Sequence, residues 1–160
     1  MNSEEILSML DQRQIDYQVV NHPAVYTAEE ADKYTADYDF ARAKNLFLHD
    51  KQHLYLVMMR DDQRLDMKQL RQQLESGRLS FAKEQQLTAI LGVTTGAVSP
   101  FNLLNDQQHQ VKAVVDKGLL AESPLIGCHP NVNTQTVIIK ISDLLEMIRQ
   151  WGNEVIQILL

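Results

Sequence analysis

Two apolar runs separated by a short polar turn constrain the fold of this chain more than any other feature. Residues 43–48 and 54–59 are short and rich in aliphatic and aromatic side chains, which is the pattern of paired β-strands, so a β-hairpin is predicted here. Lys44 is near the start of the first run, and strand alternation places it on the same face as Leu46 and Leu48. A charge on an apolar face needs an anionic partner or access to water. From spacing alone, a lysine at a strand end that extends to water is the commoner explanation.

The other segments predict helices and strands in an irregular order. Helices are expected to begin after the capping residues Asn2, Thr27, Asp66 and Ser142, and a further helix is expected over residues 83–91. Further strands are expected at 17–20, 79–81, 111–115, 136–141 and 155–160. The strict βαβα alternation of a doubly wound fold is absent. We therefore expect one α+β domain over residues 1–160, with a mixed, mostly antiparallel sheet, curled or closed into a barrel, and surrounding helices.

Composition excludes several classes of protein. No run of about 18 apolar residues could span a membrane, and the acidic start of the chain is unlike a signal peptide. A single cysteine fits a reducing cytosol, so a cytoplasmic protein is expected. The net charge of −6 argues against general coating of nucleic acid. However, residues 42–83 carry nine Lys and Arg against five Asp and Glu, which leaves a local basic patch open.

Three arrangements that resemble catalytic sites have simpler explanations. Cys128 and His129 are adjacent, so on an extended chain they point to opposite faces and make a poor dyad; a buried structural thiol is the better interpretation. His49 and His53 flank the predicted hairpin turn and have no evident third metal ligand. Ser99 is not in the Gly-x-Ser-x-Gly motif of a nucleophile elbow. None of these residues predicts a hydrolase or a metal site.

Three other features are weak alone but specific together: Lys44-Asn45 in its strand, the glycine and proline loop at 96–100, and the polar cluster that begins at His129-Pro130. The motifs that carry a family resemblance are residues 22–31, 44–48, 64–66, 79–81, 91–94, 96–101, 105–106 and 129–134. In this order they resemble the prolyl-tRNA editing family, the free-standing deacylases related to YbaK and to the insertion domain of bacterial prolyl-tRNA synthetases. The likeness covers nearly the whole chain and is greatest to alanyl-tRNA(Pro) deacylases of the ProXp-ala or PrdX type.

The resemblance implies hydrolysis of the aminoacyl ester at the 3′ adenosine of a mischarged tRNA(Pro), most simply Ala-tRNA(Pro). A second, smaller site is needed because a methylene or two changes binding by only ~1–3 kcal/mol. Two alternatives stay open: the same reaction on Cys- or Ser-tRNA, and a tRNA-binding module without catalysis. The implied partner is the tRNA(Pro) acceptor end, with prolyl-tRNA synthetase as a further candidate. The resemblance implies no metal, cofactor or membrane.

The resemblance also implies roles for individual residues. Lys44 is expected to bind the terminal phosphate or the aminoacyl end, Gly96 to present loop amides to the ester carbonyl, and His129 to bound the pocket. The expected substrate-binding residues are Asn45, Ala97, Val98, Ser99, Pro100 and Asn131. The acceptor end is expected to be gripped by Arg42, Arg64, Lys68 and Arg71.

Overall fold

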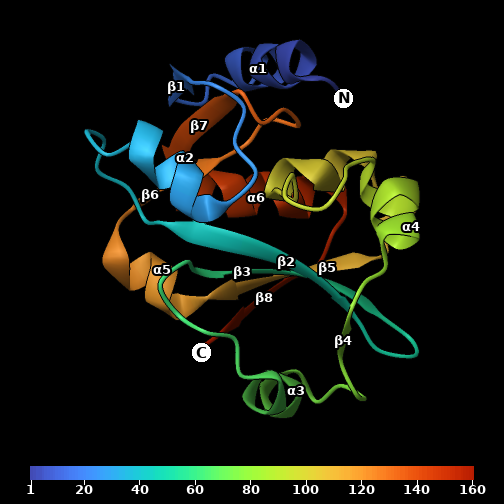
Figure 1. The fold of residues 1–160 in the computed structure, drawn as a ribbon. Coiled ribbons are helices and arrows are strands. Elements are labelled where there is room, and N and C mark those ends of the chain that lie inside the picture. The colour runs from blue at the N-terminus through green and yellow to red at the C-terminus, as the bar shows by residue number, and fades with distance from the viewer.

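Two β-sheets organise the fold of this computed structural model, which describes residues 1–160 (Figure 1). The first sheet is antiparallel, in the order β1 (Tyr17–Asn21), β7 (Gln135–Lys140) and β6 (Leu125–Cys128). The second sheet has the order β4 (Ser80–Phe81), β2 (Ala43–His49), β3 (Leu54–Arg60), β5 (Val111–Asp116) and β8 (Val155–Ile158). Its β3–β5 and β5–β8 pairs are parallel and its other pairs are antiparallel. The predicted α+β class with a mixed, mostly antiparallel arrangement is confirmed, but neither sheet closes, so the barrel alternative is wrong.

The helical elements surround these sheets. They are α1 (Ser3–Gln12), α2 (Ala28–Tyr34), α3 (Met67–Leu74), α4 (Glu84–Gln86), the π-helical turn η1 (Leu87–Leu91), the 3-10 helix η2 (Pro100–Asn105), α5 (Lys117–Glu122) and α6 (Ile141–Trp151). Three predicted caps are confirmed: Asn2 forms a capping box with Glu5, and the side chains of Thr27 and Asp66 accept from backbone amides of the helices they begin. No helix has the length and apolar character needed to cross a membrane.

Two details of the helix predictions are wrong. The last helix begins at Ile141 rather than after Ser142, because β7 runs directly into it and the Ile141 amide donates to the Pro124 carbonyl. The loop predicted after Gly92 contains η2, which Ser99 caps by accepting from the Phe101 amide. Short helical turns of this kind contain too few residues to establish a helical period.

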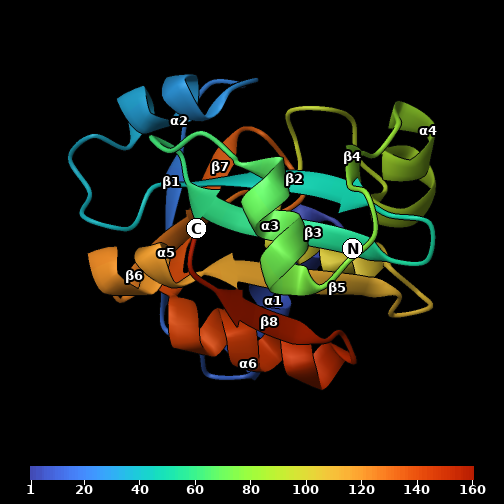
Figure 2. The ribbon, with the colours of Figure 1, turned by 90° about the horizontal axis from the view of Figure 1, so that it is seen from below.

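The β2–β3 hairpin divides the hydrophobic residues between the two faces of the second sheet. Phe47 and Met58 belong to the larger core, which is shared with both sheets and α6, whereas Leu48 and Val57 pack with Leu70 of α3. Figure 1 accordingly has α3 below the sheet and α2, α4 and α6 above it, and Figure 2 shows α3 lying across β2 and β3. The two faces are therefore covered by different elements.

One edge of β2 is only partly paired. β4 pairs with Leu48 and His49 alone, so residues 43–46 have β3 on one side and no strand on the other. This open edge lies beneath α2 (Figure 1). It brings Lys44 and Asn45 to the wall of a cavity.

Candidate active site

A cavity of about 460 Å³ lies between α2, the open edge of β2, β4, the loop at 94–98 and the end of β6. Its walls include small and apolar side chains such as Ala28, Ala31, Phe47 and Leu87. The cavity is thus built by segments that are far apart in the sequence. A ligand inside it would contact all of them at once.

Five of the sequence-predicted site residues line this cavity: Lys44, Asn45, Gly96, Val98 and His129. Lys44 takes part in none of the ion pairs of the protein. By strand alternation its side chain begins on the face of Leu46 and Leu48, so it reaches the cavity wall at the open edge of β2. The Oδ1 atom of Asn45 is buried and accepts no hydrogen bond. A buried acceptor without a donor is costly, so this oxygen is suited to a donor on a ligand.

The loop at 94–98 presents two backbone amides. Gly96 has a φ of +92°, and a Cβ there would lie 2.9 Å from the Tyr26 carbonyl oxygen, so conformation and close packing both require glycine. The Ala97 amide donates to Thr94, while the amides of Gly96 and Val98 have no partner within the protein. Two unpaired donors two residues apart in a cavity wall can stabilise a negative oxygen if both point at it.

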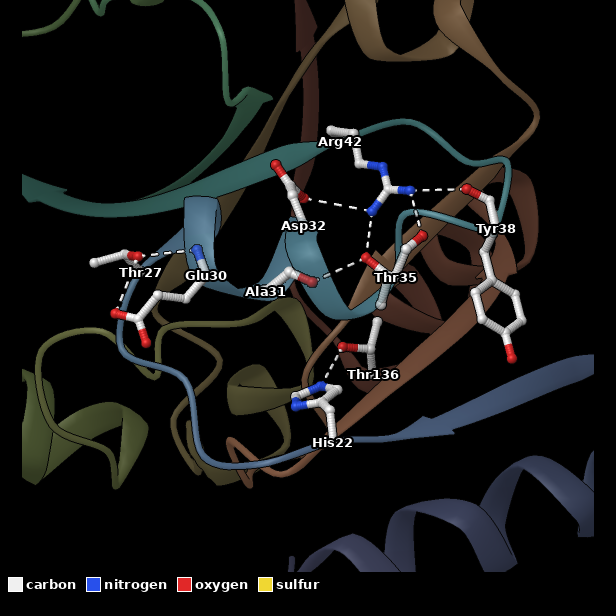
Figure 3. Close-up of polar contacts among 9 residues, drawn as sticks. All are labelled: His22, Thr27, Glu30, Ala31, Asp32, Thr35, Tyr38, Arg42 and Thr136. Carbon is white, nitrogen blue, oxygen red and sulfur yellow. Dashed lines mark hydrogen bonds and ion pairs between the residues drawn. The ribbon is translucent and has the colours of Figure 1, made fainter.

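His129 is a neutral imidazole with a defined tautomer. Its Nδ1 lies 2.9 Å from the Gln135 carbonyl oxygen, to which it donates, so Nε2 is left as an acceptor. Burial lowers the pKa of His129, and the nearby His22 ring lowers it further, against an opposing effect of the Gln135 hydrogen bond. His22 in turn accepts at Nε2 from the hydroxyl of Thr136, another cavity residue, over 2.9 Å (Figure 3).

Four residues predicted to bind substrate are absent from the cavity wall: Ala97, Ser99, Pro100 and Asn131. Ser99 is fully buried, and its hydroxyl donates to the backbone carbonyl of His129 over 2.6 Å. Asn131 accepts from Asn102 and donates to the Met1 carbonyl. Because their polar groups are used internally, Ser99 and Asn131 support the wall rather than face the cavity.

Arg42 is a structural residue rather than a free surface cation (Figure 3). Its guanidinium group donates to the hydroxyl of Thr35, and to the carbonyl oxygens of Thr35 and Tyr38 at 2.7 Å each. It also pairs with Asp32 at 3.4 Å and lies 3.8 Å above the Phe40 ring centroid. With its donors used in this way, Arg42 braces α2, and its predicted contact with tRNA stays a prediction.

The other predicted tRNA contacts lie away from the cavity. Arg64, Lys68 and Arg71 are exposed on α3 and the turn before it. This helix covers the opposite face of the second sheet (Figures 1 and 2). These three basic residues are therefore separated from the cavity by the sheet, and their predicted contact with tRNA stays a prediction.

Sequence reasoning missed Asp32, Thr136 and the exposed ring of Phe81, all of which line the cavity. The spacing of Ala28 and Ala31 one turn apart on α2 was a usable signal, because small residues on one helix face indicate close approach. Cys128 is buried, as predicted, and burial raises the pKa of its thiol to about 12.

Comparison with known proteins adds independent information. Residues 22–147 match the model of the aminoacyl-tRNA editing domain. The prolyl-tRNA editing protein ProX of Acetoanaerobium sticklandii is 40% identical over 153 residues, covering 94% of this chain and 92% of that protein. Prolyl-tRNA synthetase associated domain-containing protein 1 of Danio rerio is 33% identical, with coverages of 92% and 81%.

A more distant relative carries a different substrate in its name. The multifunctional Ser/Thr-tRNA deacylase ProXp-y of Escherichia coli strain K12 is 26% identical over 149 residues, covering 90% of this chain and 86% of that protein. A solved structure of a candidate trans-editing enzyme for prolyl tRNA synthetase aligns with a TM-score of 0.74 and 20% identity, covering 97% of this chain and 94% of that one. At that identity the structural likeness supports the fold.

Proposed function

The chain belongs to the family of aminoacyl-tRNA editing domains and is an aminoacyl-tRNA deacylase. From this premise we propose that its substrate is Ala-tRNA(Pro). We also propose that residues 1–160 act as one editing domain. The observation that carries the proposal is the common cavity of Lys44, the unpaired Gly96 and Val98 amides, and His129. An ester carbonyl, a phosphate and a water need these three kinds of group.

The proposed reaction needs little beyond positioning. Water attacks the ester carbonyl carbon, the bond from that carbon to the ribose oxygen breaks, and the products are a free amino acid and a tRNA with a free terminal hydroxyl. The amides of Gly96 and Val98 donate to the oxygen that becomes negative in the tetrahedral intermediate. The neutral His129 accepts at Nε2 from the attacking water or from the neighbouring ribose hydroxyl.

The proposed contact with tRNA is small, which fits a net charge of −6. Lys44 pairs with the terminal phosphate. Phe81 is 58% exposed while also lining the cavity, so its ring offers a stacking surface to an unpaired terminal base. Asn45 accepts from a ribose or amino group through its unpartnered oxygen. Prolyl-tRNA synthetase is proposed as a partner only through the names of the relatives.

Alanine is proposed as the cleaved residue because small aliphatic side chains form much of the wall, among them Ala28 and Ala31. The apolar part of the wall gives a methyl group a favourable site. Serine or threonine is the second candidate, supported by the Ser/Thr-tRNA deacylase relative and by the Thr136 hydroxyl in the wall.

The test is a deacylation panel of tRNA(Pro) carrying alanine, serine, threonine, cysteine or proline, with Lys44→Ala as the control. Preferential loss of alanine that Lys44→Ala abolishes supports the full proposal. Faster loss of serine or threonine would replace the substrate while keeping the mechanism. Binding of charged tRNA without any cleavage would instead favour a binding module and contradict the proposed reaction.

A further inference from the structure

We propose that Asp32 binds the α-ammonium group of the aminoacyl ester, so that the cavity recognises its substrate through two opposite charges. This inference rests on the proposed function and adds a specificity-determining residue to it. Among the residues that line the cavity, Asp32 supplies the one carboxyl group and Lys44 the one amino group. The 3′ end of an aminoacyl-tRNA carries the complementary pair, an ammonium on the amino acid and a phosphate on the terminal nucleotide.

An ion pair with Arg42 holds the carboxyl group of Asp32 in place at the cavity wall. One oxygen, Oδ1, pairs with Arg42, while the other is turned away from that guanidinium group (Figure 3). The side chain is 39% exposed and lines the cavity. Because Arg42 is itself fixed by backbone carbonyls, the ion pair orients Asp32 at the cavity wall, where the carboxyl group of Asp61 also interacts with it.

The local charge balance favours an added cation. The carboxyl group of Asp61 also acts on Asp32, while Arg42 forms its ion pair with Asp32. Burial, followed by the influence of Asp61, raises the pKa of Asp32 to about 7, and Arg42 opposes this. A proton relieves the repulsion in the free protein, and a substrate ammonium can take the place of that proton.

A second acceptor supports the same assignment. The Oδ1 atom of Asn45 is buried without a partner, and Asn45 lines the same cavity. An ammonium group has three N–H donors to satisfy, so a cavity that supplies a carboxylate and an unpartnered amide oxygen suits it. An ester whose amino group is blocked in an amide, as in peptidyl-tRNA, lacks this cation and is expected to be rejected.

The experiment compares Ala-tRNA(Pro) with lactyl-tRNA(Pro), in which a hydroxyl group replaces the ammonium at nearly constant size. Single-turnover rates are divided by the uncatalysed hydrolysis rate of each ester, since the ammonium itself activates the ester. The wild type is expected to favour the alanyl ester by roughly 10- to 100-fold, the size of a charge-assisted hydrogen bond. Asp32→Asn should reduce this preference to about twofold or less by slowing the alanyl ester alone.

Asp61→Asn is the matched control, because it removes a carboxylate from the same cluster and leaves Asp32 in place. It should keep the preference for the alanyl ester. Equal slowing of both esters in Asp32→Asn would overturn the inference, since that is the signature of a structural role. The ratio of the normalised wild-type rates on the alanyl and lactyl esters is a test that needs no variant. Equal rates would also overturn the inference.

Failure of the proposed function gives a different result. If alanine is not the cleaved residue, the aminoacyl-tRNA(Pro) that the wild type does cleave and its α-hydroxy analogue replace the alanyl pair. Cleavage of none of the esters by the wild type would remove the proposed reaction and this inference together. Cleavage with an unchanged ratio in Asp32→Asn would remove this inference alone.

Discussion

Replacing Gly96 by alanine should damage both stability and deacylation, and the structure sets the size of the effect. An alanine at a φ of +92° is in a region that costs about 1–2 kcal/mol for an L residue. Its Cβ would also lie 2.9 Å from the Tyr26 carbonyl oxygen, so the loop must move by several tenths of an ångström. Together we expect a loss of ~2–3 kcal/mol in the free energy of unfolding, because neither effect relieves the other.

The same displacement moves the unpaired amides of Gly96 and Val98 away from the ester oxygen. Removing one donor of this kind costs roughly 100- to 1,000-fold in kcat, so a partial displacement should cost at least ~10-fold. Gly77→Ala is the control, because its Cβ would meet only Asp50, at an ordinary 3.7 Å. Urea unfolding and single-turnover deacylation are measured on both variants. If Gly96→Ala matched Gly77→Ala in both assays, the assignment of the loop would be wrong.

Three further predictions concern the thiol, the basic helix and the carboxyl cluster. Since burial raises the pKa of Cys128 to about 12, iodoacetamide at pH 8 should leave the folded protein unmodified by mass spectrometry, and labelling of the native protein would contradict this. Replacing Arg64, Lys68 and Arg71 together by serine should leave both tRNA affinity and its salt dependence within about twofold of wild type, because α3 covers the face of the second sheet opposite the cavity. A reduced salt slope in a filter-binding titration would show instead that these residues contact tRNA. Because the raised pKa of Asp32 is about 7, a proton occupies its carboxyl group below this pH. The value of kcat/KM, corrected for background hydrolysis, should therefore fall as pH drops from 8 to 6, and Asp32→Asn should remove that part of the fall. An identical pH profile in the variant would count against a role of Asp32.

Local sequence signals predicted those parts of the fold that depend on neighbouring residues. The hairpin of β2 and β3 needs only two apolar runs and a turn, and the caps at Thr27 and Asp66 act within one helical turn. The parallel pairing of β3, β5 and β8 joins segments separated by many residues, and no local pattern encodes it. The expectation of a barrel was wrong for that reason.

The site divides in the same way. The motifs containing Lys44, Gly96 and His129 indicated three segments, and the fold brings them to one cavity, although their catalytic roles stay predictions. Asp32 was missed because an acid on a short helix is usually a solvated surface residue. The structural role of Arg42 was not foreseen because the carbonyl groups that bind it, at Thr35 and Tyr38, belong to a helix end and turn whose position sequence alone does not give.

The open edge of β2 at 43–46 also bears on the behaviour of the protein between encounters with substrate. A strand edge with unpaired backbone groups is a template on which a strand from another molecule can add, and natural proteins often guard such an edge with a lysine. Lys44 is in that position, so we expect its charge to disfavour the addition of a strand at this edge. Its removal is therefore expected to increase aggregation as well as abolish deacylation, and activity of Lys44→Ala should be normalised to the monomer fraction.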